Sequence, residues 1–252
     1  MTNKKPKLSI IINHFRTPNV LKMCLDSIKE KTHDIDYEII VTDSATEETT
    51  IAMLKQYHSD VFFIGDKENI GFSKSVNPAI KKSIGEYILN INADIIFEEN
   101  NCLGKLIEFL EKNPDVGVVG PKLLNIDGSL QHTYFRDYNI LTVLARRTVF
   151  GNTFFGKDIV NKFVYGDKGV VNNPMDVDWL RGSAYLMKRD RFEKVGSWFD
   201  DRFFMYFEDV DLSRRFRENG FRVVYYPAVK FTHYHIKHRM ALADLRIYSQ
   251  IG

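Results

Sequence analysis

The first 95 residues alternate short apolar runs with amphipathic stretches, and no other feature of the chain constrains its fold as strongly. The apolar run at 8–12 is typical of a strand that is buried on both faces of a parallel sheet, and the runs at 37–42, 61–64 and 87–91 predict three further strands. Apolar residues at helical spacing begin near Thr17, Thr46 and Ser73, although Pro78 should disturb the first turns of the third helix. Strands and helices that alternate over short connections predict an α/β fold, with a mostly parallel central sheet flanked by helices.

The rest of the chain predicts further elements with less regular spacing. They are a helix over 103–110, strands at 116–119, 177–180 and 182–187, a helix that starts near 208, and a strand at 221–226 that Pro227 ends. The pair Asp127-Gly128 indicates a tight hairpin. Between Gln131 and Pro174 the periodicity fades, so we expect a mobile or irregular segment there. Because the chain has no internal repeat and no low-complexity linker, we expect a single domain over 1–252.

Composition and charge exclude several classes of protein. The 252 residues carry a net charge of only +2, which gives no reason to expect nucleic acid as a partner. Cys24 and Cys102 lack metal-ligand spacing and fall in apolar helical patterns, so we interpret them as buried free thiols in a reducing compartment. No apolar run approaches the length of a membrane span, and no apolar core follows the first five residues. We therefore expect the protein in the cytoplasm.

Polar residues follow three of the predicted strands at the point where each strand ends. They are Asn13-His14, Asp43 and Asn92-Ala93-Asp94. Ligands of open parallel sheets bind beyond the carboxyl ends of the strands, so these clusters should meet at one binding edge. A carboxylate such as Asp94, together with a distant histidine such as His233, suits a divalent ion that bridges a diphosphate. Taken singly, each of these residues could equally be a turn, a helix cap or a satisfied histidine.

The stretch 200–212 joins an aromatic run to three carboxylates. Glu208, Asp209 and Asp211 stand at the predicted start of a helix, where the helix dipole favours their ionised form. Carboxylates beside an apolar surface are what a general base or a metal site needs, whereas an acidic helix cap is the alternative. The chain has neither the Gly-rich spacing of a dinucleotide-binding loop nor that of a Walker loop, which argues against a Rossmann dehydrogenase.

Together these residues resemble the inverting glycosyltransferases of family two, which have the GT-A fold, and in particular their bacterial rhamnosyltransferases. Asn92-Ala93-Asp94 occupies the place of the family's Asp-x-Asp metal motif, and residues 204–212 match its catalytic-base segment. The spacing from Pro227 to His233 is that of the metal-binding histidine. The other matching segments are 9–13, 39–44, 69–72 with Asn77, and 120–131. Two features depart from the pattern: Asn92 replaces the first aspartate, and Trp198 is an extra bulky residue before Phe199-Asp200.

The resemblance implies roles for residues in a nucleotide-binding half, about 7–95. Asp43 would accept a hydrogen bond from N3–H of uracil or thymine, which cytosine cannot donate. Asp94 and His233 would hold Mg²⁺ or Mn²⁺ on the diphosphate. The further residues expected to contact the nucleotide are Asn13, Asn69, Gly71 and Asn92. The donor would be dTDP-rhamnose, with a UDP-sugar as the alternative.

The resemblance also implies an acceptor half, about 96–238, followed by a tail at 239–252. Asp209 would be the general base that takes a proton from the acceptor hydroxyl, with inversion at the sugar carbon. The residues expected near the sugar or the acceptor are Gly182, Ser183, Ala184, Trp198 and Glu208. Independently of the resemblance, irregular segments such as 131–174 often carry acceptor specificity. The acceptor would be a lipid-linked glycan of a cell-wall, capsule or other surface polysaccharide, reached by peripheral association with the inner face of the cell membrane.

Two other classes remain open at this point. A nucleotidyltransferase would also have a carboxylate and a metal at a strand end, but it should carry a basic phosphate-gripping loop, which is not evident in the sequence. A non-catalytic nucleotide-sugar-binding module would keep Asp43 and lose Asp209 or His233. The chain keeps all three residues.

Overall fold

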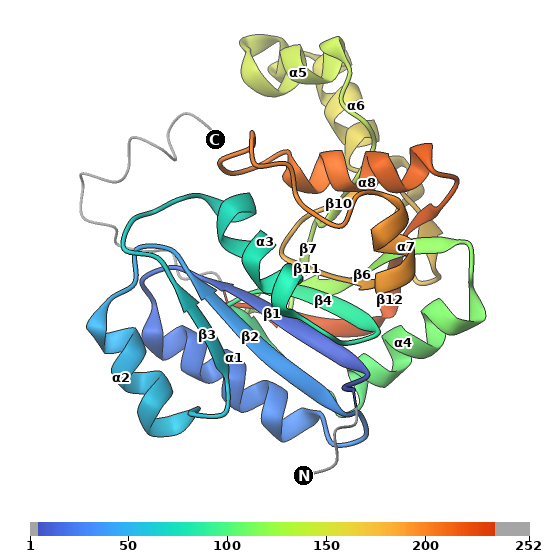
Figure 1. Ribbon diagram of the computed structural model, residues 1–252. Coiled ribbons are helices and arrows are strands. Elements are labelled where there is room, and N and C mark those ends of the chain that lie inside the picture. Colours follow the sequence, from blue (N-terminus) through green and yellow to red (C-terminus); the bar gives the residue numbers. More distant parts are fainter. Residues whose placement is uncertain (1–4, 235–252) are drawn as a thin grey trace.

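The computed structural model describes residues 5–234 (Figure 1). The predicted tail at 239–252, as well as His235 and His238, lies outside the described residues. The strands are β1 (Leu8–His14), β2 (Tyr37–Asp43), β3 (Phe62–Gly65), β4 (Tyr87–Asn92), β5 (Ile95–Ile96), β6 (Val116–Leu124), β7 (Leu130–Gln131), β8 (Tyr134–Phe135), β9 (Met175–Asp176), β10 (Trp179–Leu180), β11 (Ala184–Lys188) and β12 (Arg222–His233). The helices are α1 (Pro18–Lys31), α2 (Glu48–Tyr57), α3 (Phe72–Lys82), α4 (Cys102–Lys112), α5 (Ile140–Arg147), η1 (Val149–Asn152), α6 (Phe154–Phe163), η2 (Gly166–Lys168), α7 (Arg189–Lys194) and α8 (Glu208–Glu218).

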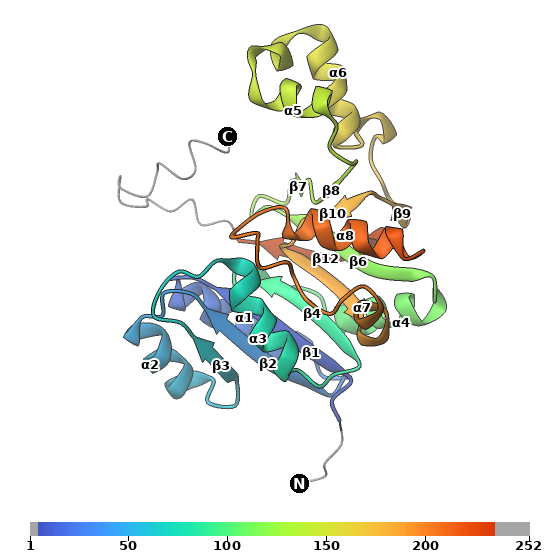
Figure 2. The ribbon, with the colours of Figure 1, turned by 45° about the horizontal axis from the view of Figure 1, so that its top comes forward.

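One mixed sheet forms the centre of the molecule (Figure 2). Its strands follow the order β3-β2-β1-β4-β11-β6-β12-β5. The first four of these strands are parallel, β11 runs antiparallel to both of its neighbours, and β6 and β12 are again parallel. The predicted α/β fold with a mostly parallel sheet is therefore confirmed. Because β4 pairs with β11, with Ala184 in register with Ile91 although the two residues are 93 positions apart, the C-terminal half completes the sheet that the N-terminal half begins.

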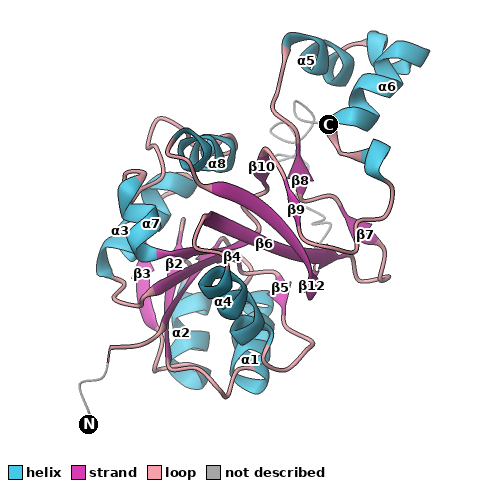
Figure 3. Ribbon diagram, turned by 90° about the vertical axis from the view of Figure 1, so that its right-hand side faces the viewer, coloured by secondary structure: helices cyan, strands magenta, loops and turns pink. Residues whose placement is uncertain are grey.

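Helices cover both faces of this sheet (Figure 3). Successive strand residues point to opposite faces, so Ile10 and Ile12 of β1 pack with α1, α2 and α4, whereas Ile11 packs with α3, α7 and α8. This explains why the N-terminal strands are continuous apolar runs. Cys24 and Cys102 are buried free cysteines in α1 and α4, as predicted.

Two predictions about prolines were wrong. Pro227 does not end its strand, because β12 continues to His233. The pairing of β12 with β6 is irregular between Tyr226 and Lys230, and a proline without an N–H group is tolerated where the ladder is interrupted. Pro78 lies inside α3, and the helix extends through it from Phe72 to Lys82.

The segment expected to be irregular contains two helices, α5 and α6, separated by η1. Both begin at a side-chain cap: Asn139 Oδ1 accepts a hydrogen bond from the Thr142 amide, and Thr153 Oγ1 accepts one from the Gly156 amide. The predicted hairpin is present upstream of them, with Gly128 at φ 78° between β6 and β7. The segment is therefore helical where the sequence pattern indicated no regular structure.

Candidate active site

Three of the predicted polar clusters meet at the carboxyl ends of β1, β2 and β4. In the sheet register Asn13 lies beside Asn92, and His14 lies beside Asp43. The Ala93 amide donates a hydrogen bond of 3.0 Å to the Asn13 carbonyl, which ties the end of β4 to the end of β1. The predicted convergence at one sheet edge is confirmed.

Asp43 is held by a histidine at this edge. His14 Nε2 accepts a hydrogen bond of 2.9 Å from the Thr17 amide, so Nδ1 carries the proton and donates it to Asp43 Oδ1 at 2.8 Å. The other oxygen, Oδ2, is buried and has no hydrogen-bond partner within residues 5–234. Asp43 therefore has one oxygen left to accept a donor, but its side chain is only 1% exposed. Its role in reading the base stays a prediction.

Asp94 and His233 come together from the ends of two distant strands. Asp94 directly precedes β5, which pairs with the end of β12 through Ile95↔His233. His233 Nε2 lies 3.0 Å from Asp94 Oδ1, while Nδ1 is 2.6 Å from Gln131 Oε1. Because an amide oxygen can only accept, Gln131 selects the tautomer with the proton on Nδ1 and turns Nε2 toward the carboxylate.

This pair fits a divalent ion that is shared with a substrate. Oδ1 of Asp94 is buried and accepts no hydrogen bond from the residues described, so the oxygen suits a cation. Among residues 5–234 no group of three or more His, Cys, Asp or Glu side chains could hold a metal ion. Mg²⁺ commonly takes one or two protein ligands and completes its shell with phosphate oxygens and water. A site with two protein ligands is therefore suited to a diphosphate-bound ion.

Asp209 lies in the first turn of α8, as predicted, and its side chain is partly buried. Oδ2 accepts a hydrogen bond of 2.9 Å from the Gly182 amide, and Oδ1 accepts one of 2.9 Å from the Val210 amide. Burial raises the pKa of Asp209 above its usual value, although these two hydrogen bonds favour the charged form. A partly buried carboxylate with a raised pKa has the properties of a general base.

The chain before α8 is strained. Tyr206 and Phe207, which precede Glu208, have φ angles of 68° and 70°, in the left-handed region that non-glycine residues rarely adopt. Backbone strain of this kind persists only where the surroundings impose it, and it concentrates at functional sites. The strained turn sets the direction in which Glu208 and Asp209 enter the helix.

Glu208 is buried next to Asp209. Burial and the charge of Asp209 raise the pKa of Glu208 to about 8, so this carboxyl is protonated at neutral pH. Its Oε2 atom and the Tyr185 hydroxyl are both buried, and neither has a hydrogen-bond partner within the described part of the chain. The two adjacent carboxyls therefore have different environments, and Asp209 is the one held by backbone amides.

The loop 181–183 connects Asp209 with the strand-end cluster. Besides the Gly182 amide on Asp209, the Gly182 carbonyl accepts a hydrogen bond of 3.2 Å from Asn90 Nδ2. The Ser183 carbonyl accepts one of 3.0 Å from the Asn92 amide. Asn92 is two residues from Asp94. Two hydrogen bonds of the loop 181–183 thus connect Asp209 through the backbone to the segment that carries Asp94, while Ala184 begins β11.

Asn69 and Gly71 fix the loop that leads into α8. Asn69 Oδ1 accepts a hydrogen bond of 3.1 Å from the Gly71 amide, and the Phe72 amide donates one of 2.8 Å to the Phe204 carbonyl. Gly71 has φ 84°, and a β-carbon there would lie 2.3 Å from that carbonyl. Glycine is required because the Phe204 backbone approaches so closely. The nucleotide contact predicted for these two residues stays a prediction.

The comparison with known proteins identifies the family of this chain. A model of glycosyl transferase family 2 matches residues 9–164, which include β1, the strand-end cluster and Asp94. The chain belongs to glycosyl transferase family 2. The resemblance inferred from the motifs is confirmed.

Relatives of this family 2 chain include enzymes of surface-glycan synthesis. It is 27% identical over 245 residues to the O-antigen biosynthesis protein RfbC of Myxococcus xanthus, covering 94% of this chain and 18% of that protein. It is 25% identical to the N-acetylglucosaminyl-diphospho-decaprenol L-rhamnosyltransferase of Mycobacterium tuberculosis, over 78% of this chain and 66% of that protein. It is also 25% identical to the rhamnosyltransferase WbbL of Escherichia coli, over 89% and 82%. The chain thus spans less than two thirds of the first two of these relatives.

Solved structures with the same fold confirm the GT-A assignment. A mannosyltransferase of Pyrobaculum calidifontis in complex with GDP-mannose and Mn²⁺ matches with a TM-score of 0.63 and 17% identity, over 99% of this chain and 63% of that one. The structure of GalNAc-T7 with UDP, GalNAc and Mn²⁺ matches with a TM-score of 0.66 and 14% identity, over 92% and 44%. At such identity the likeness concerns the fold alone.

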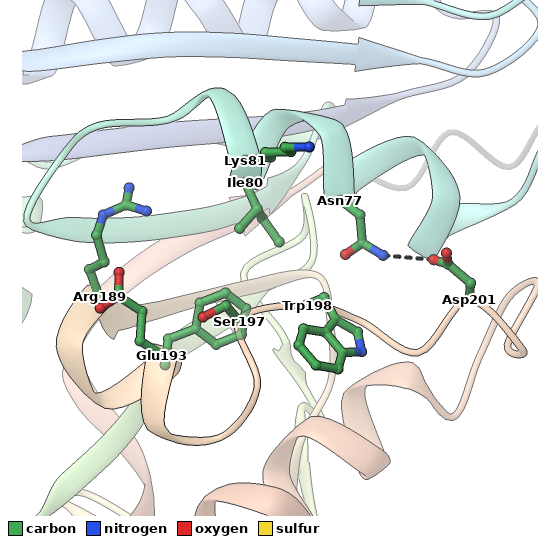
Figure 4. Close-up of a pocket in the computed structure, with 9 residues that line it drawn as sticks. Asn77, Ile80, Lys81, Arg189, Glu193, Ser197, Trp198 and Asp201 are labelled. Atoms are coloured by element: carbon green, nitrogen blue, oxygen red, sulfur yellow. Dashed lines mark hydrogen bonds between the residues drawn. The ribbon is translucent and has the colours of Figure 1, made fainter.

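Trp198 of the family 2 domain lines a cavity of about 560 Å³ between α3, α7 and the loop before α8 (Figure 4). Asn77 pins this loop, because its side chain bonds the Phe199 backbone and Asp201 Oδ1. The lining residues are Asn77, Ile80, Lys81, Arg189, Phe192, Glu193, Ser197, Trp198 and Asp201, a set that includes none of the other predicted site residues. This cavity is not lined by Asp209, and the acceptor role of Trp198 stays a prediction.

The aromatic wall that the sequence suggested beside Asp209 is not what buries it. Phe204 and Tyr206 are 54% and 40% exposed. Asp209 instead contacts Gly182, and the buried Tyr185 lies nearby, where burial first and then the charge of Asp209 raise the pKa of its hydroxyl. The shielding comes from β11 and the loop before it, which are distant in sequence.

Sequence reasoning gave no role to His14 or Gln131, although both orient a predicted site residue. His14 was visible as a polar residue past the end of β1, next to Asn13. Gln131 stood at the end of the hairpin motif. Neither position reveals its partner from sequence alone, because Asp43 and His233 are 29 and 102 positions away.

Proposed function

We propose that this chain is an inverting glycosyltransferase that moves a sugar, in the first instance rhamnose, from a nucleotide-diphospho-sugar to a hydroxyl of a lipid-linked glycan. The observation that carries the proposal is the partly buried, amide-held Asp209 carboxylate, which the loop 181–183 links to the segment of the Asp94–His233 pair. Family membership supports the reaction class. Two of the relatives are named as rhamnosyltransferases, which supports rhamnose as the sugar.

Asp209 acts as the base. An acceptor hydroxyl that attacks the sugar carbon from the face opposite the diphosphate loses its proton to Asp209, and the carbon is inverted through an oxocarbenium-like state. The Gly182 amide holds the carboxylate in position during this transfer. Glu208, protonated at neutral pH, orients the first turn of α8 and is not the base.

Asp94 Oδ1 and His233 Nε2 would hold Mg²⁺ or Mn²⁺ with the donor diphosphate. When bound, such an ion neutralises charge that develops on the leaving nucleoside diphosphate. Asn92 stands where the family's metal motif has its first aspartate. The proposed ion site of this chain therefore has one negative charge fewer. Gln131 keeps His233 in the tautomer that can bind a cation.

The donor is dTDP-rhamnose, with a UDP-hexose as the alternative. Asp43 Oδ2 is an acceptor without a donor in the described structure, and N3–H of thymine or uracil would supply one. Because Oδ2 is buried, the residues around Asp43 must move slightly apart for the nucleobase to enter. Asn13, Asn69, Gly71 and Asn92 would contribute the rest of the nucleotide site.

The acceptor is a glycan intermediate on a polyprenyl lipid at the inner face of the cell membrane, on the route to a surface polysaccharide. One relative is named for transfer to a decaprenyl diphosphate-linked sugar, which supports this class of acceptor. None of the helices in residues 5–234 is long and apolar enough to cross a membrane. Contact with lipid would therefore be peripheral for this part of the chain.

A non-catalytic nucleotide-sugar-binding module is the remaining alternative. It would need the strand-end cluster but would have no use for a partly buried, amide-held carboxylate at Asp209. A panel of dTDP-, UDP-, GDP- and CMP-sugars distinguishes the transferase from the binding module. Binding is measured by calorimetry, and donor turnover is measured with and without acceptor. We expect dTDP- or UDP-sugars to bind and to be turned over. Binding without turnover on any lipid-linked acceptor would favour the module, and binding of GDP- or CMP-sugars only would refute the role of Asp43.

A further inference from the structure

Residues 139–163, which we call the helical arm, project away from the sheet and its covering helices (Figures 1 and 3). Small residues hold the arm together: Thr142, Ala145 and Gly156 are its buried positions on α5 and α6 before Phe163. A β-carbon at Gly156 would lie 2.1 Å from the Phe150 carbonyl oxygen, so the turn and the helix are packed as closely as glycine allows. An arm with an interior this narrow has no room for its large side chains.

The large apolar side chains of the arm point outward instead. Seven of the sixteen residues at 140–155 are large, apolar and exposed, out of nineteen such residues in the described part of the chain. They are Ile140, Leu141, Val143 and Leu144 on α5, and Val149, Phe154 and Phe155 on the turn and α6. The most exposed are Val149 at 83%, Phe154 at 82% and Phe155 at 72%. A patch of this kind marks a contact with another molecule or with a membrane.

The charge of the arm indicates which of these it contacts. Residues 139–163 contain four basic residues and one acidic residue, Asp158, so the arm carries +3 against +2 for the whole chain. Lys157 is exposed at the start of α6 next to Phe154 and Phe155. Basic side chains around exposed aromatic and aliphatic ones are typical of segments that lie in the interface of anionic membranes. The same arm of a second copy would bring the same positive charge, which disfavours a symmetric contact between copies.

The root of the arm contacts the catalytic helix. The Tyr138 ring lies 5.5 Å from the ring of Phe207, the residue before Glu208. Arg217 of α8 forms hydrogen bonds of 2.7 and 2.8 Å with both oxygens of Asp137. The loop at 204–207 next to this root also exposes four large apolar side chains. A surface that binds the arm would therefore be held beside the turn that carries Asp209.

We propose that the helical arm docks the protein on an anionic phospholipid bilayer, with Val149, Phe154 and Phe155 entering the interface and Lys157 contacting the headgroups. The inference rests on the proposed function only in that the bilayer would hold the lipid-linked acceptor. Binding to lipid itself needs neither donor nor acceptor. Its failure is therefore distinguishable from a failure of the transferase assignment.

The experiment is co-sedimentation of the full chain with vesicles of phosphatidylcholine, with and without phosphatidylglycerol, in the absence of nucleotide. The wild type is expected to sediment with the anionic vesicles, and added salt should release part of it. The double variant Phe154→Ser/Phe155→Ser should lose at least about tenfold in vesicle affinity, since each phenyl group contributes apolar area to the interface. Lys157→Glu should weaken binding to anionic vesicles and not to neutral ones.

The matched control is Ile84→Ser/Ile126→Ser, because these residues are 52% and 60% exposed but lie outside the arm. It should bind vesicles like the wild type, and thermal unfolding of all variants should show that each is folded. The proposal is overturned if the wild type does not sediment with anionic vesicles. It is also overturned if the control loses as much vesicle affinity as Phe154→Ser/Phe155→Ser. Light scattering that shows a dimer dissociated by Phe154→Ser/Phe155→Ser, without vesicle binding, would assign the arm to a contact between copies instead.

Discussion

The backbone N–H of Gly182 donates a hydrogen bond of 2.9 Å to Oδ2 of Asp209, and this contact joins the two halves of the site. Gly182 precedes β11, the antiparallel strand between β4 and β6, whereas Asp209 is the second residue of α8, which packs on the sheet face of Ile11 through Leu212 and Phe216. Since the Ser183 carbonyl accepts a hydrogen bond from the Asn92 amide, a shift of the loop 181–183 would move Asp209 relative to Asp94 and His233. The loop is therefore a positioning element of the proposed enzyme.

Gly71→Ala should lower transfer, whereas Gly128→Ala should not. Both glycines have positive φ, 84° and 78°, so each substitution costs roughly 1 kcal/mol of folding free energy. Only at Gly71 would the new methyl group meet the Phe204 carbonyl, which anchors the loop before α8, because nothing lies within 4 Å at Gly128. Denaturant unfolding and turnover measured for both variants separate strain from displacement of the loop. Equal turnover in the two variants would mean that the Phe204 contact does not position the base.

Asp94→Ala should abolish the effect of Mg²⁺ or Mn²⁺ on nucleoside diphosphate binding. The substitution removes the carboxylate that faces His233 Nε2, which is one of the two protein ligands of the proposed ion. Calorimetric titration with the diphosphate, with the ion and with EDTA, measures this directly. If transfer by the wild type is unchanged in excess EDTA, the ion has no part in the mechanism and cationic side chains must carry the charge.

Gln131→Leu should weaken the ion-dependent step without removing a ligand. The leucine cannot accept the proton of His233 Nδ1, so the ring loses its fixed tautomer and orientation. Loss of such a partner typically lowers metal affinity about 10- to 100-fold. The readout is the Mn²⁺ concentration that gives half-maximal turnover, which should rise while turnover at saturating Mn²⁺ recovers. Gln131→Glu, which keeps the acceptor, should restore the low requirement, and a permanent loss at saturating metal would point to a folding defect.

Glu208→Gln should stabilise the protein at alkaline pH. Because the folded-state pKa of Glu208 is raised from 4.5 to about 8, its contribution to stability is complete below pH 4.5 and is lost as the pH rises through 8. That difference corresponds to roughly 5 kcal/mol at most. The variant, which cannot ionise, should therefore melt several degrees above the wild type at pH 9 and close to it at pH 4.5. A Tm difference that does not change with pH would show that Glu208 is not buried as a neutral acid.

The periodic part of the fold could be predicted from sequence because β1, β2 and β4, the inner strands of the N-terminal half, are covered on both faces. Ile10, Ile11 and Ile12 must all be apolar, and the run is recognisable without knowledge of the partners. The extent of β12 could not be predicted, since Pro227 is tolerated only where the ladder with β6 is interrupted. Helices α5 and α6 escaped prediction because their large apolar residues face outward, so the usual buried stripe is missing.

The candidate site, like the fold, was predictable only in part. Residues that stand at strand ends, such as Asn13, Asp43 and Asn92, were predictable as a cluster because parallel strands end at one edge. Contacts between residues that lie far apart in the sequence could not be predicted. The pairing of His233 with Gln131, and the contact of Asp209 with Gly182, depend on the return of β11 and β12 into the sheet.

The central claim is that Asp209, and not Glu208, is the general base. Asp209→Asn is nearly isosteric and keeps an oxygen that can accept from the Gly182 amide, so folding and donor binding should survive. Glu208→Gln resembles the protonated side chain that the wild type already has at neutral pH, and its effect on turnover should be small.

The most direct test is to measure donor affinity and single-turnover transfer for Asp209→Asn and Glu208→Gln side by side at pH 7. We predict unchanged donor affinity in both variants, and a loss of transfer in Asp209→Asn of about 10²- to 10⁴-fold, the contribution typical of a positioned base. Near-normal transfer in Asp209→Asn together with inactivity of Glu208→Gln would contradict the account and assign the base to Glu208.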